Sequence, residues 1–387
     1  MEKSNWRNFD IPLLIGVLTI ALFGVMMVYS ATHTDPVLAP LNMYLKQLGI
    51  GVGLGMVLLF IMASLDYHLF ESITLLVYLL CLGLLGIVRF FGDTTLGATR
   101  WIDLGFTDLQ PSEIAKLLMI LVLARFFAIN QHRIRKLPVF TFSLLTAAPA
   151  MLLVFLQPDL GTTMVLIAIW VCMAWSAGSD PLHVFGLIFI VVPIVLLVWF
   201  APDLTGGNVK IFQKYQYDRL HSFIDPNFAN PDERRNLEVS NRAVVGGGVT
   251  GQGYANGTQN TLNYLSIRHT DFIFSVIAEE FGFIGSVALM VLLSLMLLRI
   301  VHIAQKSLDT FGRMICIGVL TMLFFQMFIN IGMNVGIFPV TGIPLPLISN
   351  GNSAMWTTFI ALGIVESVAM RQRRDVTWYY RSGPALE

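Results

Sequence analysis

The sequence predicts an all-α integral membrane protein with ten membrane-spanning helices and one large loop outside the membrane. Of the 387 residues, 56% are hydrophobic and 12% are charged. The mean hydropathy is +0.72, far outside the range of soluble globular domains. Apolar runs of about 20 residues recur along the chain, and such a run is long enough to cross a bilayer as a helix. We therefore expect one polytopic membrane domain over residues 1–387.

The apolar runs define the ten expected spans. They begin at about Ile11, Gln47, Ile73, Ser112, Val139, Leu160, Leu182, Thr270, Arg313 and Ser353. The first run is too long for the apolar region of a cleaved signal peptide. The sixth, from Leu160 to Ala177, is at the short end of the spanning range, and Pro158 and Gly161 at its start predict a helix that begins inside a crevice.

Basic residues set the predicted orientation. With ten spans, the Lys and Arg residues of the short connections all fall on one side: Lys3, Arg7, Arg125, Arg133, Arg135, Lys136, Arg299, Lys306, Arg313, Arg371, Arg373 and Arg374. Such residues favour the cytoplasmic side. We expect a multi-pass protein of the cytoplasmic (inner) membrane with both termini in the cytoplasm and a cytoplasmic tail over residues 371–387.

The large outer loop covers about residues 201–269, between the seventh and eighth spans. A loop this long in a compact protein is usually functional or disordered. Its glycine-rich run GGGVTGQG has two interpretations, a close approach of the backbone to another segment or simple flexibility.

Residues 262–285, LNYLSIRHTDFIFSVIAEEFGFIG, combine charges with an apolar segment. Five ionisable residues lie at the start of the apolar part or inside it: Arg268, His269, Asp271, Glu279 and Glu280. Burying such groups in a membrane is costly, which points to function. On a helix that begins near Thr270, Asp271 and Glu279 share one face, which predicts a polar path. Asp271 also suits a helix cap, and His269 suits a hydrogen-bonding neighbour as well as a base.

Two other spans begin with charged residues. Pro111 suits the first position of a helix, and Glu113 and Lys116 are three residues apart on one face. An intrahelical ion pair would explain both charges, but a cation inside a membrane helix is also a candidate for substrate binding because its burial is costly. Asp159 suits a cap of the sixth span or a place in the site.

Several functions are not supported. The sequence contains no GxxxxGK[ST], HExxH or CxxC motif, so nucleotide hydrolysis and zinc chemistry are not indicated. The net charge is zero, which gives no argument for a nucleic acid partner. The three cysteines, Cys81, Cys172 and Cys316, lie in apolar runs and suit small hydrophobic roles.

Five motifs carry a resemblance to a known family. They are RWIDLG at residues 100–105, QPSEIAK at 110–116, QPDLGT at 157–162, RHTDFIFSVIAEEFGFIG at 268–285 and GIPLPLIS at 342–349. The chain resembles the SEDS proteins (shape, elongation, division and sporulation) over nearly its whole length. The glutamine that opens QPDLGT, Gln157, resembles the residue found there in the RodA branch rather than in the FtsW branch. Three stretches depart from the family pattern: LSIRHTDF, Val239 before Ser240, and SNGNS at 349–353.

The resemblance implies a peptidoglycan glycosyltransferase that polymerises lipid II outside the membrane for cell elongation and rod shape. It implies inversion at the donor sugar, release of undecaprenyl pyrophosphate, and a class B penicillin-binding protein that cross-links the strands. Two alternatives remain: a lipid II flippase or transporter, whose charges would line a transport path, and a scaffold that only holds the transpeptidase.

The resemblance also implies roles for individual residues. It makes Asp271 the catalytic base. The other expected substrate and pyrophosphate residues are Lys46, Arg100, Trp101, Glu113, Lys116, Asp159, Arg268, His269, Glu279, Glu280 and Ser349. Cations, or Mg²⁺ or Mn²⁺ held partly by carboxylates, would neutralise the leaving pyrophosphate. Trp101 would present a flat apolar face to a sugar or prenyl segment, or anchor the chain at the membrane interface.

Overall fold

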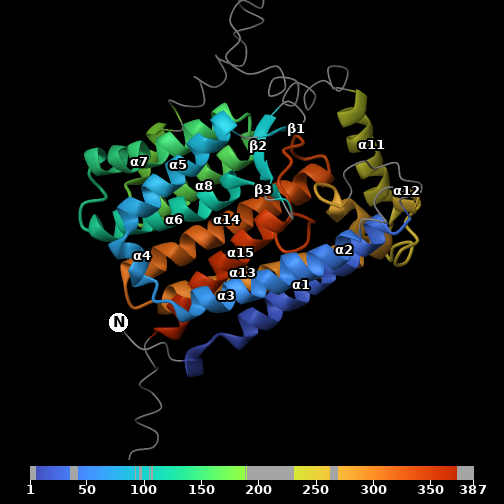
Figure 1. The fold of residues 1–387 in the computed structure, drawn as a ribbon, viewed down its shortest axis with the longest axis horizontal. Helices are drawn as coiled ribbons and strands as arrows, with labels where there is room; N and C mark the ends of the chain where they lie inside the picture. The colour runs from blue at the N-terminus through green and yellow to red at the C-terminus, as the bar shows by residue number, and fades with distance from the viewer. Residues whose placement is uncertain are drawn as a thin grey trace, which may run out of the picture.

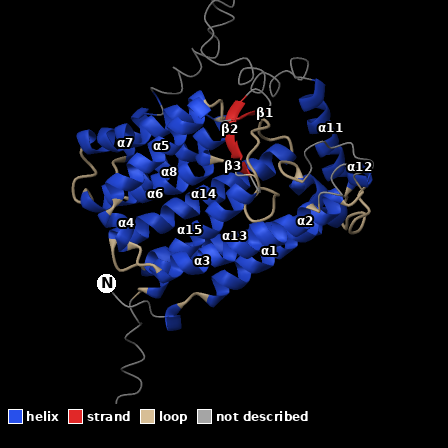
Figure 2. Ribbon diagram, viewed as in Figure 1, coloured by secondary structure: helices blue, strands red, loops and turns tan. Residues whose placement is uncertain are grey.

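The computed structural model describes residues 6–34, 42–91, 93–95, 98–103, 105, 108–187, 189, 231–261 and 269–372. Nearly all of this part is helical, as the sequence predicts (Figure 2). The helices are η1 (Trp6–Asn8), α1 (Ile11–Thr32), α2 (Met43–Lys46), η3 (Gln47–Gly53), α3 (Leu54–Ser64), α4 (His68–Ser72), α5 (Thr74–Phe91), α6 (Pro111–Ile129), α7 (Leu137–Leu156), α8 (Leu160–Ser176), α11 (Pro231–Gly246), α12 (Thr258–Thr261), α13 (Ile273–Lys306), α14 (Thr310–Asn334) and α15 (Asn352–Met370).

Membrane-spanning helices dominate the described part of the chain. By length and composition, six are able to cross a membrane: Ile11–Thr32, Met43–Ser64, Leu137–Leu156, Ile273–Lys306, Thr310–Asn334 and Asn352–Met370. Thr74–Val88 and Leu160–Ser176 are shorter apolar helices, and α6 lies at the fourth expected span. Most of the seventh expected span, and of the large loop before residue 231, lies outside the described residues, so the count of ten stays a prediction.

The core of the bundle is built around α14 and α15. α14 packs against α6, α8, α13 and α15, and α15 packs closely against α3 (Figure 1). Buried residues occur on every side of α15, as expected of a helix that is surrounded by protein. By contrast, Leu75, Leu76, Leu79 and Leu80 of α5 are more than half exposed, which is the pattern of a helix face turned towards lipid.

Two predicted boundaries are wrong, and both errors affect site residues. The second span begins at Met43 rather than Gln47, because α2, the π-helical η3 and α3 form one run; Lys46 therefore lies within a helix and not before it. α13 begins at Ile273 rather than Thr270. Asp271 lies in the preceding turn, and the residue at the cap position is Phe272, which makes no side-chain cap, so Asp271 is not the cap of this helix.

A small antiparallel sheet lies in the segment between α5 and α6 and is a minor addition to the all-α fold. Its strands are β1 (Asp93–Thr95), β2 (Ala98–Asp103) and β3 (Asp108–Leu109), in the order β1-β2-β3 (Figure 2). Trp101 lies on β2 opposite Asp93. The sheet lies close to the start of α6, because β3 ends two residues before it.

α13 is broken at Gly282, where φ is 65° and ψ is −162°. The outer-loop segment at residues 248–253 fills the break. Gln252 N and Gly253 N donate to the carbonyls of Glu279 and Glu280, at 2.9 and 3.0 Å, and Phe283 N and Ile284 N donate to Gly248 O and Val249 O, at 2.9 and 3.1 Å. Four loop contacts thus pair backbone groups on both sides of the break.

The loop glycines are needed for this contact. A Cβ atom at Gly247 would lie 2.0 Å from Ala278 O, and one at Gly251 would lie 2.1 Å from Glu280 O. Gly251 also has a φ of +82°, which an L residue rarely adopts. Of the two interpretations of the glycine-rich run, close backbone approach is therefore correct at these positions.

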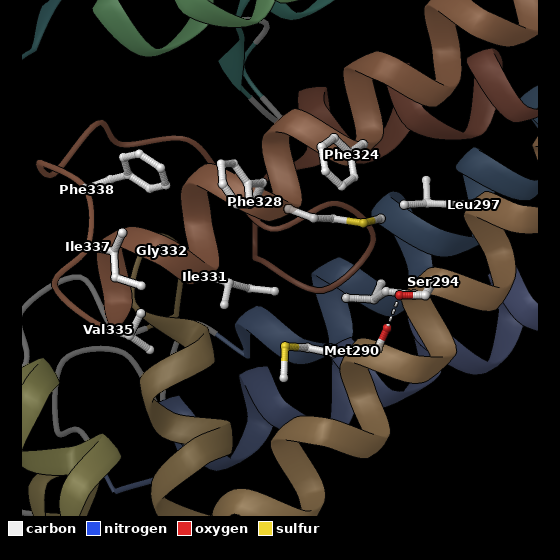
Figure 3. Close-up of a pocket in the computed structure, with 12 residues that line it drawn as sticks. Met290, Ser294, Leu297, Phe324, Phe328, Ile331, Gly332, Val335, Ile337 and Phe338 are labelled. Carbon is white, nitrogen blue, oxygen red and sulfur yellow. Dashed lines mark hydrogen bonds between the residues drawn. The ribbon is translucent and has the colours of Figure 1, made fainter.

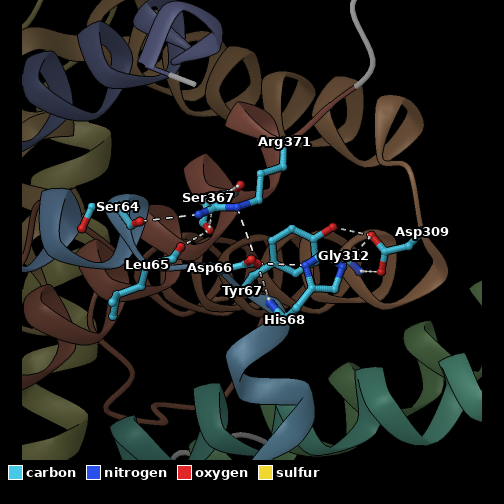
Figure 4. Close-up of polar contacts among 9 residues, drawn as sticks. All are labelled: Ser64, Leu65, Asp66, Tyr67, His68, Asp309, Gly312, Ser367 and Arg371. Carbon is cyan, nitrogen blue, oxygen red and sulfur yellow. Dashed lines mark hydrogen bonds and ion pairs between the residues drawn. The ribbon is translucent and has the colours of Figure 1, made fainter. Parts of the chain in front are cut away.

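A polar cluster lies where the end of α3, the start of α14 and the end of α15 meet (Figure 4). Arg371 Nε lies 3.5 Å from Asp66 Oδ1, and Arg371 Nη1 donates to Ser367 O at 2.9 Å. His68 Nδ1 lies 2.9 Å from Asp66 Oδ1, and Tyr67 donates to Asp309, the N-cap residue of α14. These contacts hold the turn before α4 against the start of α14 and the end of α15.

Candidate functional site

Glu113 and Lys116 form a buried ion pair in the first turns of α6. Lys116 Nζ lies 2.7 Å from Glu113 Oε1, and the two side chains are 1% and 4% exposed. Pro111 occupies the start of the helix, as the sequence predicts. The pair is an intrahelical contact between residues three apart, and its burial makes the loss of either charge costly.

Asp159 joins the starts of two helices. It caps α8, with Oδ1 accepting from Thr162 N at 3.1 Å, which confirms the predicted cap. Its other oxygen, Oδ2, accepts from Gln110 Nε2 at 3.2 Å and from Ser112 Oγ at 3.3 Å. The carboxylate therefore holds the start of α6, which carries the Glu113–Lys116 pair, beside the start of α8.

The start of α8 packs closely against another segment, while the crevice expected there stays a prediction. Pro158 has a φ of 22°, and a Cβ atom at Gly161 would lie 2.6 Å from Ile343 Cγ1 and 3.2 Å from Thr341 O. The helix therefore begins packed against the segment before α15. This segment, residues 338–351, is called the α14–α15 connection below.

The α14–α15 connection links the charged helix starts to the start of α13. Ser349 Oγ donates to Thr270 O at 2.6 Å, and Asn350 N donates to His269 O at 2.9 Å. In the first turn of α15, which follows directly, Ser353 Oγ donates to Asp108 O at 2.8 Å and accepts from Gln110 N at 3.0 Å. One short stretch of chain thus contacts both the turn with Asp271 and the segment that leads into α6.

Two asparagines hold the backbone of Asp271. Asn330 Nδ2 and Asn334 Nδ2 donate to Asp271 O at 3.1 and 3.0 Å. Asn334 Oδ1 accepts from Ser275 N at 3.2 Å and from Ser275 Oγ at 2.6 Å, and Ser240 Oγ donates to Asn334 O at 3.0 Å. Both asparagines and both serines are fully buried, so this network fixes where the turn with Asp271 lies.

These asparagines are not among the residues predicted from the sequence. A signal was present, because Asn330 and Asn334 are four residues apart in an apolar segment and therefore share one helix face. Buried amides of this kind need partners. Gln110, Ser112 and Ser353 were also not singled out, since their role depends on contacts between distant segments.

Glu279 and Glu280 lie just before the break in α13, and both are 1% exposed. Glu279 Oε1 accepts from Gln259 N in α12 at 2.7 Å. Glu280 accepts from Ser30 of α1. These carboxylates therefore connect α13 to the outer loop and to α1, while Ser275, on the expected polar face, belongs to the asparagine network. A continuous polar path from Asp271 to Glu279 stays a prediction.

The structure does not bring every expected residue into this cluster. Lys46 is exposed on α2, although its neighbour Gln47 donates through Nε2 to Ile348 O of the α14–α15 connection at 3.0 Å. Trp101 is half-buried on β2. The side chain of Arg100 and all of Arg268 lie outside the described residues, so their places stay predictions.

A separate pocket of about 330 Å³ lies between α13 and α14 (Figure 3). Its lining contains apolar side chains such as Met290, Phe324 and Phe328, with Ser294 as the one polar side chain. Ser294 Oγ donates to Met290 O at 2.7 Å. A pocket without charged side chains suits hydrocarbon rather than a pyrophosphate, so we do not assign the chemistry to it.

A complete metal site is absent from the described part of the chain. There, no group of three or more His, Cys, Asp or Glu residues is placed to hold a metal ion. Mg²⁺ commonly binds through one or two carboxylates together with water and substrate phosphates. The described residues therefore fit a metal that arrives with the substrate better than a metal held by the protein alone.

Comparison with known proteins gives consistent matches over nearly the whole chain. A family model for FtsW, RodA and SpoVE, described as cell cycle protein, matches residues 11–374. The peptidoglycan glycosyltransferase MrdB of Escherichia coli (strain K12) is 33% identical over 376 residues, covering 95% of each chain. The peptidoglycan glycosyltransferase RodA of Treponema pallidum (strain Nichols) is 31% identical over 438 residues, covering 96% of this chain and all of the relative.

Solved structures show the same fold. A chain from a peptidoglycan synthase complex, studied for the coordination of polymerization and crosslinking, aligns with a TM-score of 0.77 at 30% identity over 95% of this chain and 99% of that one. The crystal structure of the rod shape determining protein RodA of Thermus thermophilus aligns with a TM-score of 0.68 at 27% identity, over 95% of this chain and 98% of that one.

Proposed function

The chain belongs to the FtsW, RodA and SpoVE family of cell cycle proteins, and from this membership we propose that it is a peptidoglycan glycosyltransferase of the RodA type. Its substrate would be lipid II, which it would join into glycan strands for cell elongation and rod shape. The observation that carries the proposal is that the α14–α15 connection and the first turn of α15 together link the turn with Asp271 to the start of α6, where Lys116 and Glu113 are buried.

The proposed reaction is a single inverting displacement. A sugar hydroxyl of one substrate attacks the anomeric carbon of the other, and Asp271 accepts the hydroxyl proton. The bond between the anomeric carbon and the phosphate oxygen breaks, and undecaprenyl pyrophosphate leaves with the electron pair. Preorganised cations stabilise such a leaving group, and the candidates are Lys46, Arg100 and Lys116.

The structure places a condition on Lys116. Its ammonium group is paired with Glu113 and buried, so a phosphate must either join this pair or displace the carboxylate.

The fully buried asparagine network supports the assignment of Asp271 as the base. A base must be held within hydrogen-bond reach of the proton it removes, and Asn330 and Asn334 fix the backbone of this residue.

A divalent cation is part of the proposal. Mg²⁺ or Mn²⁺ would bind mainly through the phosphates of the substrate, with a carboxylate such as Asp271 or Asp159 as a partial ligand. The metal would supply positive charge at the leaving group, and the residues of the chain would position the sugar and remove the proton.

The proposed partner is a class B penicillin-binding protein that cross-links the new strands. The similarity to a synthase complex that coordinates polymerization and crosslinking supports a partner of this kind. We also propose that the protein lies in the cytoplasmic (inner) membrane with both termini in the cytoplasm, which the positive-inside rule favours.

A polymerisation assay tests the proposal. Purified protein, with and without the penicillin-binding partner, is given labelled lipid II, and the products are separated on a gel. Polymer is the expected result. Transfer of lipid II across vesicles without glycan growth would instead support a flippase, and unchanged cell growth with the Asp271→Asn variant would support a scaffold.

A further inference from the structure

A second pocket lies at the other end of the bundle, where α4, the start of α5 and the end of α6 meet. Its volume is about 310 Å³. The residues that matter here are Glu71, Ser72, Thr74, Leu75, Val122 and Arg125, all of which line it. Tyr78 also lines it, so the pocket combines one cation, one carboxylate and three hydroxyl groups with apolar side chains.

The cation and the carboxylate have incomplete partners in this pocket. Arg125 donates through Nη1 to the backbone oxygen of Glu71, and the same nitrogen lies 3.6 Å from Glu71 Oε1. The two side chains are 33% and 35% exposed. A guanidinium group has five N–H donors, so Arg125 retains donors for a ligand, and the carboxylate at 3.6 Å is beyond an ideal direct hydrogen bond.

The residues around the pocket indicate that it lies at the depth of lipid headgroups. Arg125 follows Glu113 by twelve residues in α6, which places it about 18 Å further along the helix axis. The next connection carries the exposed residues Arg133, Arg135 and Lys136, as expected at a membrane surface. On the other side, Leu75 is 72% exposed and begins the lipid-facing leucine stripe of α5. The opening is therefore polar towards the surface and apolar towards the bilayer.

The short helix α4 is held in place by the cluster in Figure 4. His68 begins α4 and contacts Asp66, whose other partner Arg371 belongs to the end of α15. Thr74 Oγ1 donates to Phe70 O and Glu71 O, both at 2.9 Å, which closes the junction with α5. The wall that carries Glu71 and Ser72 is thus fixed before any ligand binds.

From this arrangement we propose that the pocket binds the headgroup of a zwitterionic phospholipid with a primary ammonium group, such as phosphatidylethanolamine. The lipid phosphate accepts hydrogen bonds from Arg125 and Ser72, the ammonium donates to Glu71, and the acyl chains run along the exposed leucines of α5. Basic pockets between membrane helices commonly bind anionic headgroups. The carboxylate of Glu71 changes this preference, because it repels an anionic headgroup and pairs with an ammonium.

Native mass spectrometry of the full-length protein tests the proposal, with dioleoyl phosphatidylethanolamine, phosphatidylcholine and phosphatidylglycerol added separately at equal concentrations. The wild type is expected to retain phosphatidylethanolamine in preference to the other two. Arg125→Gln should weaken its binding about tenfold, as expected for a lost charge-assisted hydrogen bond. Arg133→Gln, which removes an exposed arginine of the same surface outside the pocket, should leave binding unchanged.

Glu71→Gln gives an independent test, since it should reverse the selectivity. This variant should bind phosphatidylglycerol at least as well as phosphatidylethanolamine, because the repulsive carboxylate is gone. Equal retention of all three lipids by the wild type, equal losses in Arg125→Gln and Arg133→Gln, or unchanged selectivity in Glu71→Gln would overturn the proposal. Displacement of the lipid by an equal concentration of inorganic phosphate would also overturn it, by assigning the pocket to free phosphate.

Discussion

Lys116 Nζ and Glu113 Oε1 lie 2.7 Å apart in the first turns of α6, with almost no exposure of either side chain. The stability of the fold changes differently when one charge of a buried pair is removed and when both are removed. Removing one partner leaves an uncompensated charge and costs about 3–5 kcal/mol, whereas neutral replacement of both is often tolerated. This difference separates the structural role of the pair from a role at the substrate.

The double change Glu113→Gln with Lys116→Met is expected to restore the folded yield lost in Lys116→Met alone, and to leave polymerisation at least tenfold below wild type, because the cation for the pyrophosphate is absent. Gel filtration measures the yield and the lipid II assay measures the activity. Recovery of activity in the double variant would show that Lys116 only neutralises Glu113.

Asp271→Asn is expected to leave folding and membrane insertion close to wild type. Asp271 is not the cap residue of α13, and its backbone oxygen, which the asparagine network holds, is unchanged by the substitution. Loss of a general base typically lowers the rate about 10²–10⁴-fold. Polymer yield within a few-fold of wild type, at equal folded protein, would move the search for the base to Asp159 or Glu279.

Gly282→Ala is expected to destabilise the protein by about 2–4 kcal/mol, through a strained φ and overpacking. Its Cβ atom would lie 2.3 Å from Gly251 N. Gly83→Ala is the matched control, because a Cβ atom there meets nothing within 4 Å, and alanine in a helix interior is favoured by about 0.5–1 kcal/mol. Thermal melting in detergent should show a lower Tm for Gly282→Ala alone; equal melting of the two variants would contradict the close contact.

Removal of divalent cations is expected to stop polymerisation. The purified enzyme should lose activity with a chelator and regain it with Mg²⁺ or Mn²⁺, while its melting temperature without substrate should change little, because the metal would be held mainly by substrate phosphates. Full activity in excess chelator would assign the charge of the leaving group to Lys and Arg residues alone.

Asp66→Asn is expected to lower stability at neutral pH and to have little effect in acid. Burial alone would raise the pKa of Asp66, but hydrogen bonds from His68 and the charge of Arg371 outweigh it and hold the pKa below its ordinary value of 3.8. The ionised form therefore stabilises the fold above that value, and the contribution disappears as the pH falls through the lower pKa of the folded state. Melting of both proteins in a series from pH 7 downwards should show a gap in Tm that narrows once the pH falls below 3.8; a gap of constant size would contradict the assignment.

The features that follow local rules were predictable from the sequence. Pro111 at a helix start, the Glu113–Lys116 pair and the Asp159 cap each depend on residues within four positions of one another. The membrane class follows from composition and run length. These are short-range or summed properties, and a single sequence carries them directly.

The missed features depend on contacts between distant segments. The break in α13 needs Gly282 to meet residues 248–253, and the placement of Asp271 needs Asn330 and Asn334, about sixty residues away. Apolar periodicity cannot distinguish a broken helix from a continuous one, so α13 is predicted as a plain span. The strands between α5 and α6 were missed for a related reason, since β2 is stabilised by pairing with its neighbours.

The break in α13 also bears on how the protein is made. As a helix, residues 283–306 alone extend about 36 Å, more than the hydrocarbon thickness of roughly 30 Å. Insertion of this span therefore does not require the turns before Gly282. Residues 248–253 precede α13 in the chain, so translation produces the loop before the helix that it completes. We therefore expect integration into the bilayer and assembly of the loop contacts to be separable steps in biogenesis, the second of which requires the loop to fold back onto the broken helix.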